Sequence, residues 1–157
     1  MYFRPLTRED CPFLASLFDN EEYERYFAEN DTTEEEFTER FEFWSNKENL
    51  IICDDDGQPL GWAMYQFEGD TCHLDLIVVR YSLVGSGVGY RAFDRIVRSL
   101  PPSVRRVKLD VQQRSRHAVD FYLRYGFQIV SEEKQPVGSG AQMYYNMELN
   151  INTPMKA

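Results

Sequence analysis

The 157-residue chain is 43% apolar, which suits one domain that buries roughly two-thirds of its unfolded surface. A net charge of -9 argues against nucleic-acid partners, whose phosphates require a basic surface, and favours either simple solubility or a cationic substrate. No apolar run is long enough to span a membrane, and the start MYFRPLTRED lacks a signal-peptide core, so we expect a cytoplasmic protein. Three cysteines without metal-ligand spacing predict reduced, packed thiols and no metal site: Cys11, Cys53 and Cys72.

The first elements are a short strand and a helix. Residues Tyr2 to Leu6 predict the strand, and Thr7 with Asp10 resembles a capping pair at the start of the helix. The helical stripe then continues through Cys11, Leu14, Leu17 and Phe18.

An acidic segment follows from Asn20 to Glu39, with Arg25 as its one base. Thr33 and Glu36 form a capping box ahead of a second predicted helix, whose aromatic positions are Phe37, Phe41 and Trp44. The acidic face of this segment is either a solvated surface or an acidic wall beside an amine-binding site.

Two strands, Leu50 to Cys53 and Leu60 to Phe67, are joined by the turn sequence DDDGQP. Its three aspartates do not fit the calcium-loop pattern, so we interpret the segment as a structural turn. A second tight turn, Glu68 to Thr71, leads into a third antiparallel strand, Leu74 to Val79.

A glycine-rich segment, VGSGVG from Val84 to Gly89, separates the Leu74 strand from an amphipathic helix. The apolar stripe of that helix is Phe93, Ile96, Val97 and Leu100. Glycines before a helix start can bring backbone N–H groups close to a phosphate. The segment matches neither the dinucleotide pattern nor the Gly-Lys-Ser/Thr loop of nucleotide triphosphatases. On this segment alone, a phosphate site and a ligand-free turn are equally compatible with the sequence.

The last third of the chain predicts a strand, a helix and a closing hairpin. The strand Val107 to Val111 should run parallel to the Leu74 strand, because a whole helix separates the two. Ser115 is a candidate N-cap, and Gly126 a candidate C-cap, of the next helix. Its stripe is Ala118, Phe121, Tyr122 and Tyr125. The hairpin pairs residues 127–131 with 143–149 across the loop PVGSG.

The second half resembles the GNAT superfamily of acyl-CoA N-acyltransferases. The resemblance rests on the order strand, G-x-G-x-G, helix, strand, and on the sequence AVDFYLRYGF. In that sequence Ala118, Phe121, Tyr122, Gly126 and Phe127 match the family's late motif. The implied fold is α/β (α+β): a mixed, mostly antiparallel sheet with a central parallel strand pair and helices on both faces. Residues 1–150 would form one such domain and residues 151–157 a tail.

The resemblance also implies acetyl-CoA as co-substrate. Pantetheine would pair with backbone near Val79, and pyrophosphate would lie on the loop formed by Val84, Gly85, Gly87, Val88 and Gly89. Two positions depart from the family pattern. Val84 stands where Arg or Gln is usual, and Ser115 where Asn is usual, although Ser115 could still contact CoA.

The implied chemistry assigns two catalytic candidates. Tyr122 resembles the family's general acid for the leaving thiolate, and packing in the core is its alternative role. Asp75 shares a strand face with Val79 and could accept the amine proton, directly or through water. His73 lies on the same face, and a structural role is open for both. A backbone N–H near Val79 would polarise the thioester carbonyl.

The predicted function is acetyl transfer from acetyl-CoA to an amine of a small molecule or peptide. The alternative is a catalytically weak GNAT-like module that binds acyl-CoA. A dinucleotide-dependent oxidoreductase is disfavoured, because the required glycine pattern and ribose-binding acid are missing. The sequence identifies neither the acceptor, nor the preferred acyl chain, nor the oligomeric state.

Overall fold

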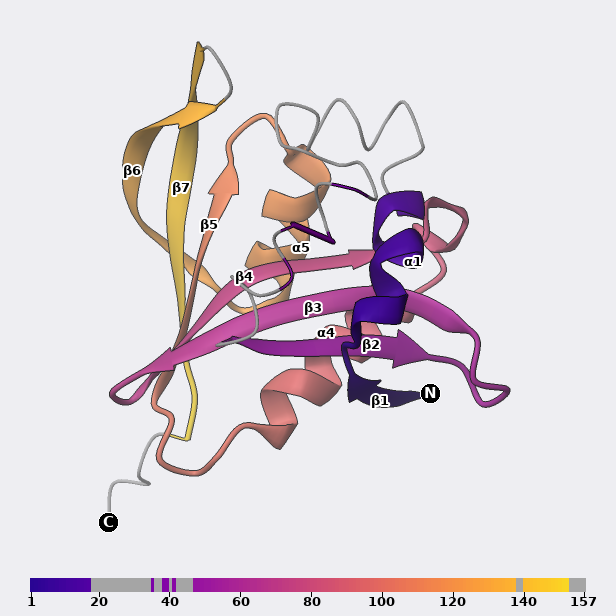
Figure 1. Ribbon diagram of the computed structural model, residues 1–157. Helices are drawn as coiled ribbons and strands as arrows, with labels where there is room; N and C mark the ends of the chain where they lie inside the picture. The colour runs from indigo at the N-terminus through magenta and orange to yellow at the C-terminus, as the bar shows by residue number, and fades with distance from the viewer. Residues whose placement is uncertain (18–34, 36–37, 40, 42–46, 138–139, 153–157) are drawn as a thin grey trace. The chain divides into compact units, whose positions relative to one another are not determined.

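The computed structural model describes residues 1–17, 35, 38–39, 41, 47–137 and 140–152 (Figure 1). The acidic segment from Asn20 to Glu39 and the second predicted helix lie almost entirely outside these residues. Within the described part of the chain, no helix is long and apolar enough to cross a membrane.

A mixed sheet of seven strands organises the described residues, in the order β1-β2-β3-β4-β5-β7-β6. The strands are β1 (Tyr2–Pro5), β2 (Glu48–Cys53), β3 (Pro59–Glu68), β4 (Thr71–Val79), β5 (Arg106–Gln112), β6 (Gln128–Val137) and β7 (Gly140–Asn150). β4 and β5 are parallel, as predicted, and pair from Thr71 with Arg106 to His73 with Lys108. The pairs β1–β2, β2–β3, β5–β7 and β6–β7 are antiparallel. The predicted fold class is therefore confirmed.

The chain forms two compact units, Met1–Tyr65 with Leu76–Ser99 and Gln66–Asp75 with Leu100–Ala157. In the first unit, α1 (Cys11–Ser16) lies in front of β2 and β3, and α4 (Val88–Ser99) lies behind them (Figure 1). The core on the α1 side consists of Cys11, Leu14, Leu17, Ile51, Cys53, Trp62, Met64 and Val78. Leu14 and Ile51 are completely buried, and burial of each side chain contributes about 1.5–3 kcal/mol.

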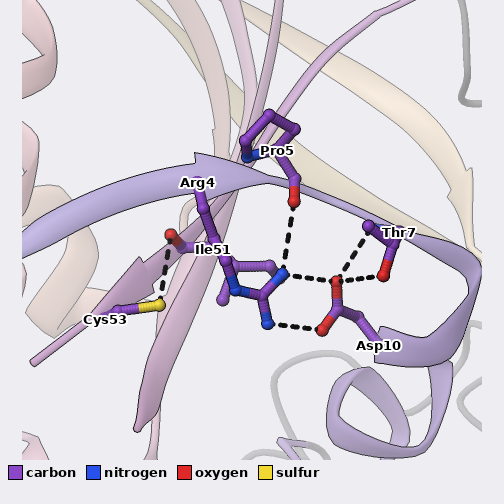
Figure 2. Close-up of polar contacts among 6 residues, drawn as sticks. All are labelled: Arg4, Pro5, Thr7, Asp10, Ile51 and Cys53. Carbon is purple, nitrogen blue, oxygen red and sulfur yellow. Dashed lines mark hydrogen bonds and ion pairs between the residues drawn. The ribbon is translucent and has the colours of Figure 1, made fainter. Parts of the chain in front are cut away.

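An ion pair joins β1 to the 3-10 helix Arg8–Asp10, which leads into α1. The Arg4 guanidinium donates hydrogen bonds of 2.8 and 2.7 Å to the two carboxylate oxygens of Asp10 (Figure 2). The Thr7 backbone N–H donates a third bond of 2.8 Å, which is the capping interaction expected from the sequence. Burial alone would raise the pKa of Asp10, but the hydrogen bonds from Arg4 and Thr7 outweigh it, and the net pKa is lowered.

The turn between β2 and β3 was predicted correctly from the sequence, whereas the ends of the strands were predicted less accurately. Gly57 has φ +84° in the β2–β3 turn, and the Asp54 carboxylate accepts bonds of 2.9 Å from the N–H groups of Asp56 and Gln58. The structural interpretation of DDDGQP is thus confirmed. The strands begin earlier than predicted, because ladder pairing continues past the apolar residues to Glu48 and Thr71.

In the second unit, β5, β7 and β6 lie side by side, with β6 in orange and β7 in yellow (Figure 1). This hairpin is longer than predicted, because β6 continues to Val137 and β7 begins at Gly140. Its helix is α5 (Arg116–Tyr125). The buried apolar side chains of these elements include Val107, Leu109, Val111, Val119, Phe127 and Met147.

Candidate active site

The glycine-rich segment forms a tight turn between β4 and α4. A 3-10 turn, Tyr81–Leu83, is followed by residues 84–87, and α4 begins at Val88. Gly85 and Gly87 have φ values of +83° and +88°, a conformation that residues with a Cβ rarely adopt. The turn is closed by hydrogen bonds of 3.0 Å from the Val84 N–H to the Tyr81 carbonyl and from the Ser86 N–H to the Leu83 carbonyl.

Gly89 lies in the first turn of α4, whereas the sequence pattern placed it in the preceding loop. Its φ is not positive, and an added Cβ would meet nothing within 4 Å. The backbone conformation therefore does not require glycine at position 89. Glycine even destabilises a helix by roughly 0.5–1 kcal/mol relative to alanine.

The turn presents backbone donors. Among the described residues, none accepts a hydrogen bond from the N–H of Gly85, Gly87 or Gly89. Three donors at the start of a twelve-residue helix can bind an anion, since the helix dipole adds a partial positive charge there. Val84 is 50% exposed beside them, so its apolar side chain does not fill the protein core.

The end of β4 is held tightly against β3. A Cβ on Gly61 would lie 2.4 Å from the Val78 carbonyl oxygen and 3.0 Å from the Val79 Cα, so only glycine fits. The next residue after β4, Arg80, donates its backbone N–H to the Leu60 carbonyl at 2.8 Å. Gly61 was not identified from the sequence; its signal was a glycine inside an otherwise apolar strand.

Tyr122 is buried in α5, with 9% of its surface exposed. Its ring contacts Phe121 and Phe127 edge-on, with centroid separations of 5.3 and 5.4 Å. Its carbonyl accepts the N–H groups of Gly126 and Phe127 at 3.1 and 2.9 Å, and Gly126 has φ +124°. The prediction that Gly126 is the C-cap of α5 is therefore confirmed. Burial raises the pKa of the Tyr122 phenol, so the hydroxyl keeps its proton at physiological pH.

Ser115 occupies the N-cap position of α5, as predicted, but its hydroxyl makes no capping hydrogen bond. The Ser115 carbonyl accepts the Val119 N–H at 3.0 Å, which is the first hydrogen bond of the helix itself. The capping role that the sequence suggested for the side chain is thus wrong.

Asp75 lies in a polar group on β3 and β4. Gln66 Nε2 donates to both Asp75 oxygens at 3.3 and 3.4 Å, and His73 Nδ1 lies 3.3 Å from Asp75 Oδ1. The neighbouring Cys72 thiol is buried, and burial together with the Asp75 charge raises its pKa to about 11. Cys72 therefore remains a protonated thiol and a poor nucleophile.

Each compact unit contains part of the predicted site. The first unit brings Val79 and the whole glycine turn together: Val84, Gly85, Gly87, Val88 and Gly89. The second unit contains Asp75, Ser115 and Tyr122.

The mixed sheet with the parallel pair β4–β5, followed by a glycine turn after β4, has the arrangement that the resemblance to acyl-CoA N-acyltransferases implied. The sequence profile of the Acetyltransferase (GNAT) family matches residues 14–127. The chain therefore belongs to the GNAT family.

Solved structures show the same fold at low sequence identity. Spermidine N-acetyltransferase from Vibrio cholerae, in complex with CoA and spermine, is 16% identical with a TM-score of 0.73, covering 95% of this chain and 94% of that one. The ribosomal-protein-S18-alanine N-acetyltransferase from Escherichia coli is 19% identical with a TM-score of 0.72, covering 99% and 96%. An acetyltransferase from Thermus thermophilus is 22% identical with a TM-score of 0.75, covering 94% and 96%. No curated protein matches the sequence.

Proposed function

We propose that this protein transfers an acetyl group from acetyl-CoA to an amine. The observation that carries the proposal is the set of three backbone donors at Gly85, Gly87 and Gly89, on a chain that belongs to the GNAT family. The Vibrio cholerae relative described with bound CoA supports this choice of co-substrate.

The glycine turn is proposed to bind the CoA pyrophosphate. Its N–H groups donate to phosphate oxygens, and the open space at Gly85 and Gly89 lets the ligand approach the backbone. The end of β4, held in place by the close contact at Gly61, would pair with the pantetheine amide through Val79 backbone. A backbone N–H near Val79 would polarise the thioester carbonyl for attack by the amine.

Tyr122 is proposed to donate a hydrogen bond to the leaving sulfur. The amine nitrogen forms a bond to the acyl carbon, the carbon–sulfur bond breaks, and its electron pair goes to sulfur. An ordinary tyrosine with a pKa near 10 is already a weaker acid than a thiol with a pKa near 8.5. The raised pKa of Tyr122 makes complete proton transfer to a free thiolate still less favourable. Hydrogen bonding, or donation concerted with bond cleavage, is therefore the role we assign.

Asp75 is proposed as the acceptor of the amine proton, directly or through water. Its hydrogen bonds from Gln66 orient the carboxylate, and His73 Nδ1 lies 3.3 Å from Asp75 Oδ1. His73 and Asp75 together thus form the candidate base.

The acceptor is proposed to be a cationic small amine or a peptide amine. Relatives of the same fold are described as acting on spermidine and on the alanine of a ribosomal protein. The acidic segment from Asn20 to Glu39 would attract such acceptors. Replacing Glu34, Glu35 and Glu36 together by Gln should raise the acceptor KM and leave the KM for acetyl-CoA nearly unchanged.

Thiol release from acetyl-CoA tests the proposal, with spermidine, spermine and a peptide bearing amino-terminal alanine as acceptors. Calorimetry with CoA and NAD is run alongside. CoA binding with amine-dependent thiol release supports the enzyme, whereas CoA binding without release supports an acyl-CoA-binding module. Gly87→Glu, which places a carboxylate in the turn, should abolish CoA binding, and parental affinity in that variant would locate the site elsewhere.

A further inference from the structure

Three arginines follow one another along α4, and two of them are engaged. Arg98 Nε donates to Asp94 at 2.9 Å. Arg95 lies over the Phe3 ring at 5.5 Å and donates to the Met1 carbonyl. The Arg91 guanidinium, by contrast, has no ion-pair or hydrogen-bond partner among the residues that the structure describes.

Arg91 extends back toward the glycine turn. Its Nη1 atom would lie 3.7 Å from a Cβ placed on Gly87. The Arg91 backbone N–H also donates to the Gly87 carbonyl at 3.0 Å, which places the two residues one helical turn apart. A positive side chain therefore lies beside Gly87, the middle glycine of the turn.

Arg80, the other arginine next to this turn, is committed elsewhere. Its Nε donates to the Pro59 carbonyl at 2.8 Å, and its guanidinium lies 4.9 Å from the centre of the Phe13 ring. Its contacts hold the beginning of β3 and α1 to the turn. Arg80 thus has a structural role. Of the two arginines that the described residues place next to the turn, Arg91 is the one whose guanidinium is available to a ligand.

We propose that Arg91 binds the CoA pyrophosphate and replaces the side-chain partner that Val84 cannot provide. Val84 is exposed and apolar at the position where an arginine or glutamine would reach the phosphates. A guanidinium that extends from α4 to within 3.7 Å of a Cβ on Gly87 can supply that charge instead. The inference rests on the proposed function, because it assigns a residue to the same CoA site.

Calorimetric titrations of CoA and 3′-dephospho-CoA into the parent and Arg91→Met test this role. Methionine keeps the length of the apolar stem and removes the charge. We expect both ligands to bind about ten-fold more weakly to the variant, by the same factor, because both contain pyrophosphate. The dependence of log Kd on log salt should also be shallower in the variant, since one ionic contact is lost.

Two further variants control the experiment. Arg98→Met removes a charge from the same helix at a paired position and should bind CoA like the parent. Arg91→Lys keeps the charge and should recover part of the lost affinity. Unchanged affinity in Arg91→Met, or a loss seen with CoA and not with dephospho-CoA, would overturn the assignment while the proposed function stands. A parent that does not bind CoA would overturn both.

Discussion

Gly61 of β3 and Val78 of β4 approach so closely that a Cβ on Gly61 would lie 2.4 Å from the Val78 carbonyl oxygen. The contact involves backbone, which cannot move aside as the tip of a flexible side chain can. The end of β4 is therefore fixed at Val79, the residue proposed to pair with pantetheine.

Gly61→Ala should destabilise the protein and weaken CoA binding together. Overpacking of this kind costs about 1–3 kcal/mol, and the displaced strand end would carry the Val79 backbone with it. Thermal unfolding and calorimetry with CoA measure the two effects. A variant with the parental melting temperature and affinity would show that β3 and β4 accommodate the methyl group without consequence.

Gly89→Ala should have the opposite effect on stability and a similar effect on binding. The position has an ordinary helical conformation and open space, so alanine should stabilise α4 by up to about 1 kcal/mol. For a chain of this length the melting temperature should then rise by roughly 2–4 °C. CoA affinity should fall, because the methyl group would lie where the ligand approaches. Higher stability with undiminished affinity would exclude Gly89 from the site.

Tyr122→Phe should lower kcat with little change in stability, because the ring and its packing remain. A loss of about 10²–10⁴-fold is usual for a single acid–base group. Because burial raises the pKa of Tyr122, its ionisation should not set the alkaline limb of the kcat profile. The variant's profile should therefore be lower at every pH, with its alkaline limb at the same place. Unchanged kcat, with chemistry rate-limiting, would leave Tyr122 a packing residue.

Elements that depend on nearby residues could be predicted from the sequence. The Asp-Gly turn at Gly57, the C-cap at Gly126 and the parallel placement of β5 each follow from a short pattern or from chain order. The full length of the β6–β7 hairpin could not be predicted from the sequence. Polar residues such as Glu132 and Lys134 carry no strand signal, and pairing with the neighbouring strand holds them in β6.

The parts of the candidate site that sequence reasoning missed depend on distances between separated segments. Gly61 is essential because β4, a whole strand further along the chain, passes within van der Waals contact of it. The partnership of Asp75 with Gln66 requires the β3–β4 register. Arg91 differs from Arg95 and Arg98 only in what surrounds each guanidinium, which a helical pattern does not encode.

Asp10→Asn should destabilise the protein at neutral pH, because it removes the charge that pairs with Arg4. The loss should be only about 1–2 kcal/mol, since Arg4 is partly exposed and solvent screens the pair. The pKa of Asp10 is lowered in the folded state, so this stabilisation is present above the unfolded pKa near 4. This stabilisation is lost as the pH falls through the lowered pKa of Asp10 in the folded protein. The gap in melting temperature between parent and variant should thus be widest near pH 7 and close below about pH 4.

Asp55→Asn is the matched control for Asp10→Asn. The amino terminus lowers the pKa of Asp55 too, through a 2.6 Å contact, but the Asp55 side chain is 90% exposed. No change in melting temperature is expected at either pH. A stability loss in Asp10→Asn that persists unchanged at about pH 3 would mean that side-chain size, and not charge, explains it.

Val84→Arg should strengthen CoA binding, and most clearly in a protein that lacks Arg91. Residue 84 is half exposed at the edge of the glycine turn, so an arginine there can reach a phosphate without displacing core atoms. A charge-assisted hydrogen bond contributes about 1.5–3 kcal/mol, less the cost of ordering a long side chain. A net gain near 1 kcal/mol corresponds to roughly five-fold in affinity.

If Arg91 already neutralises the pyrophosphate, the gain from Val84→Arg in the parent should be smaller than the gain in Arg91→Met. Calorimetry on the four proteins of this double-mutant cycle, at low and high salt, measures the difference. Equal gains in both backgrounds would mean that residues 84 and 91 act on separate charges, and no gain in either would mean that residue 84 points away from the phosphates.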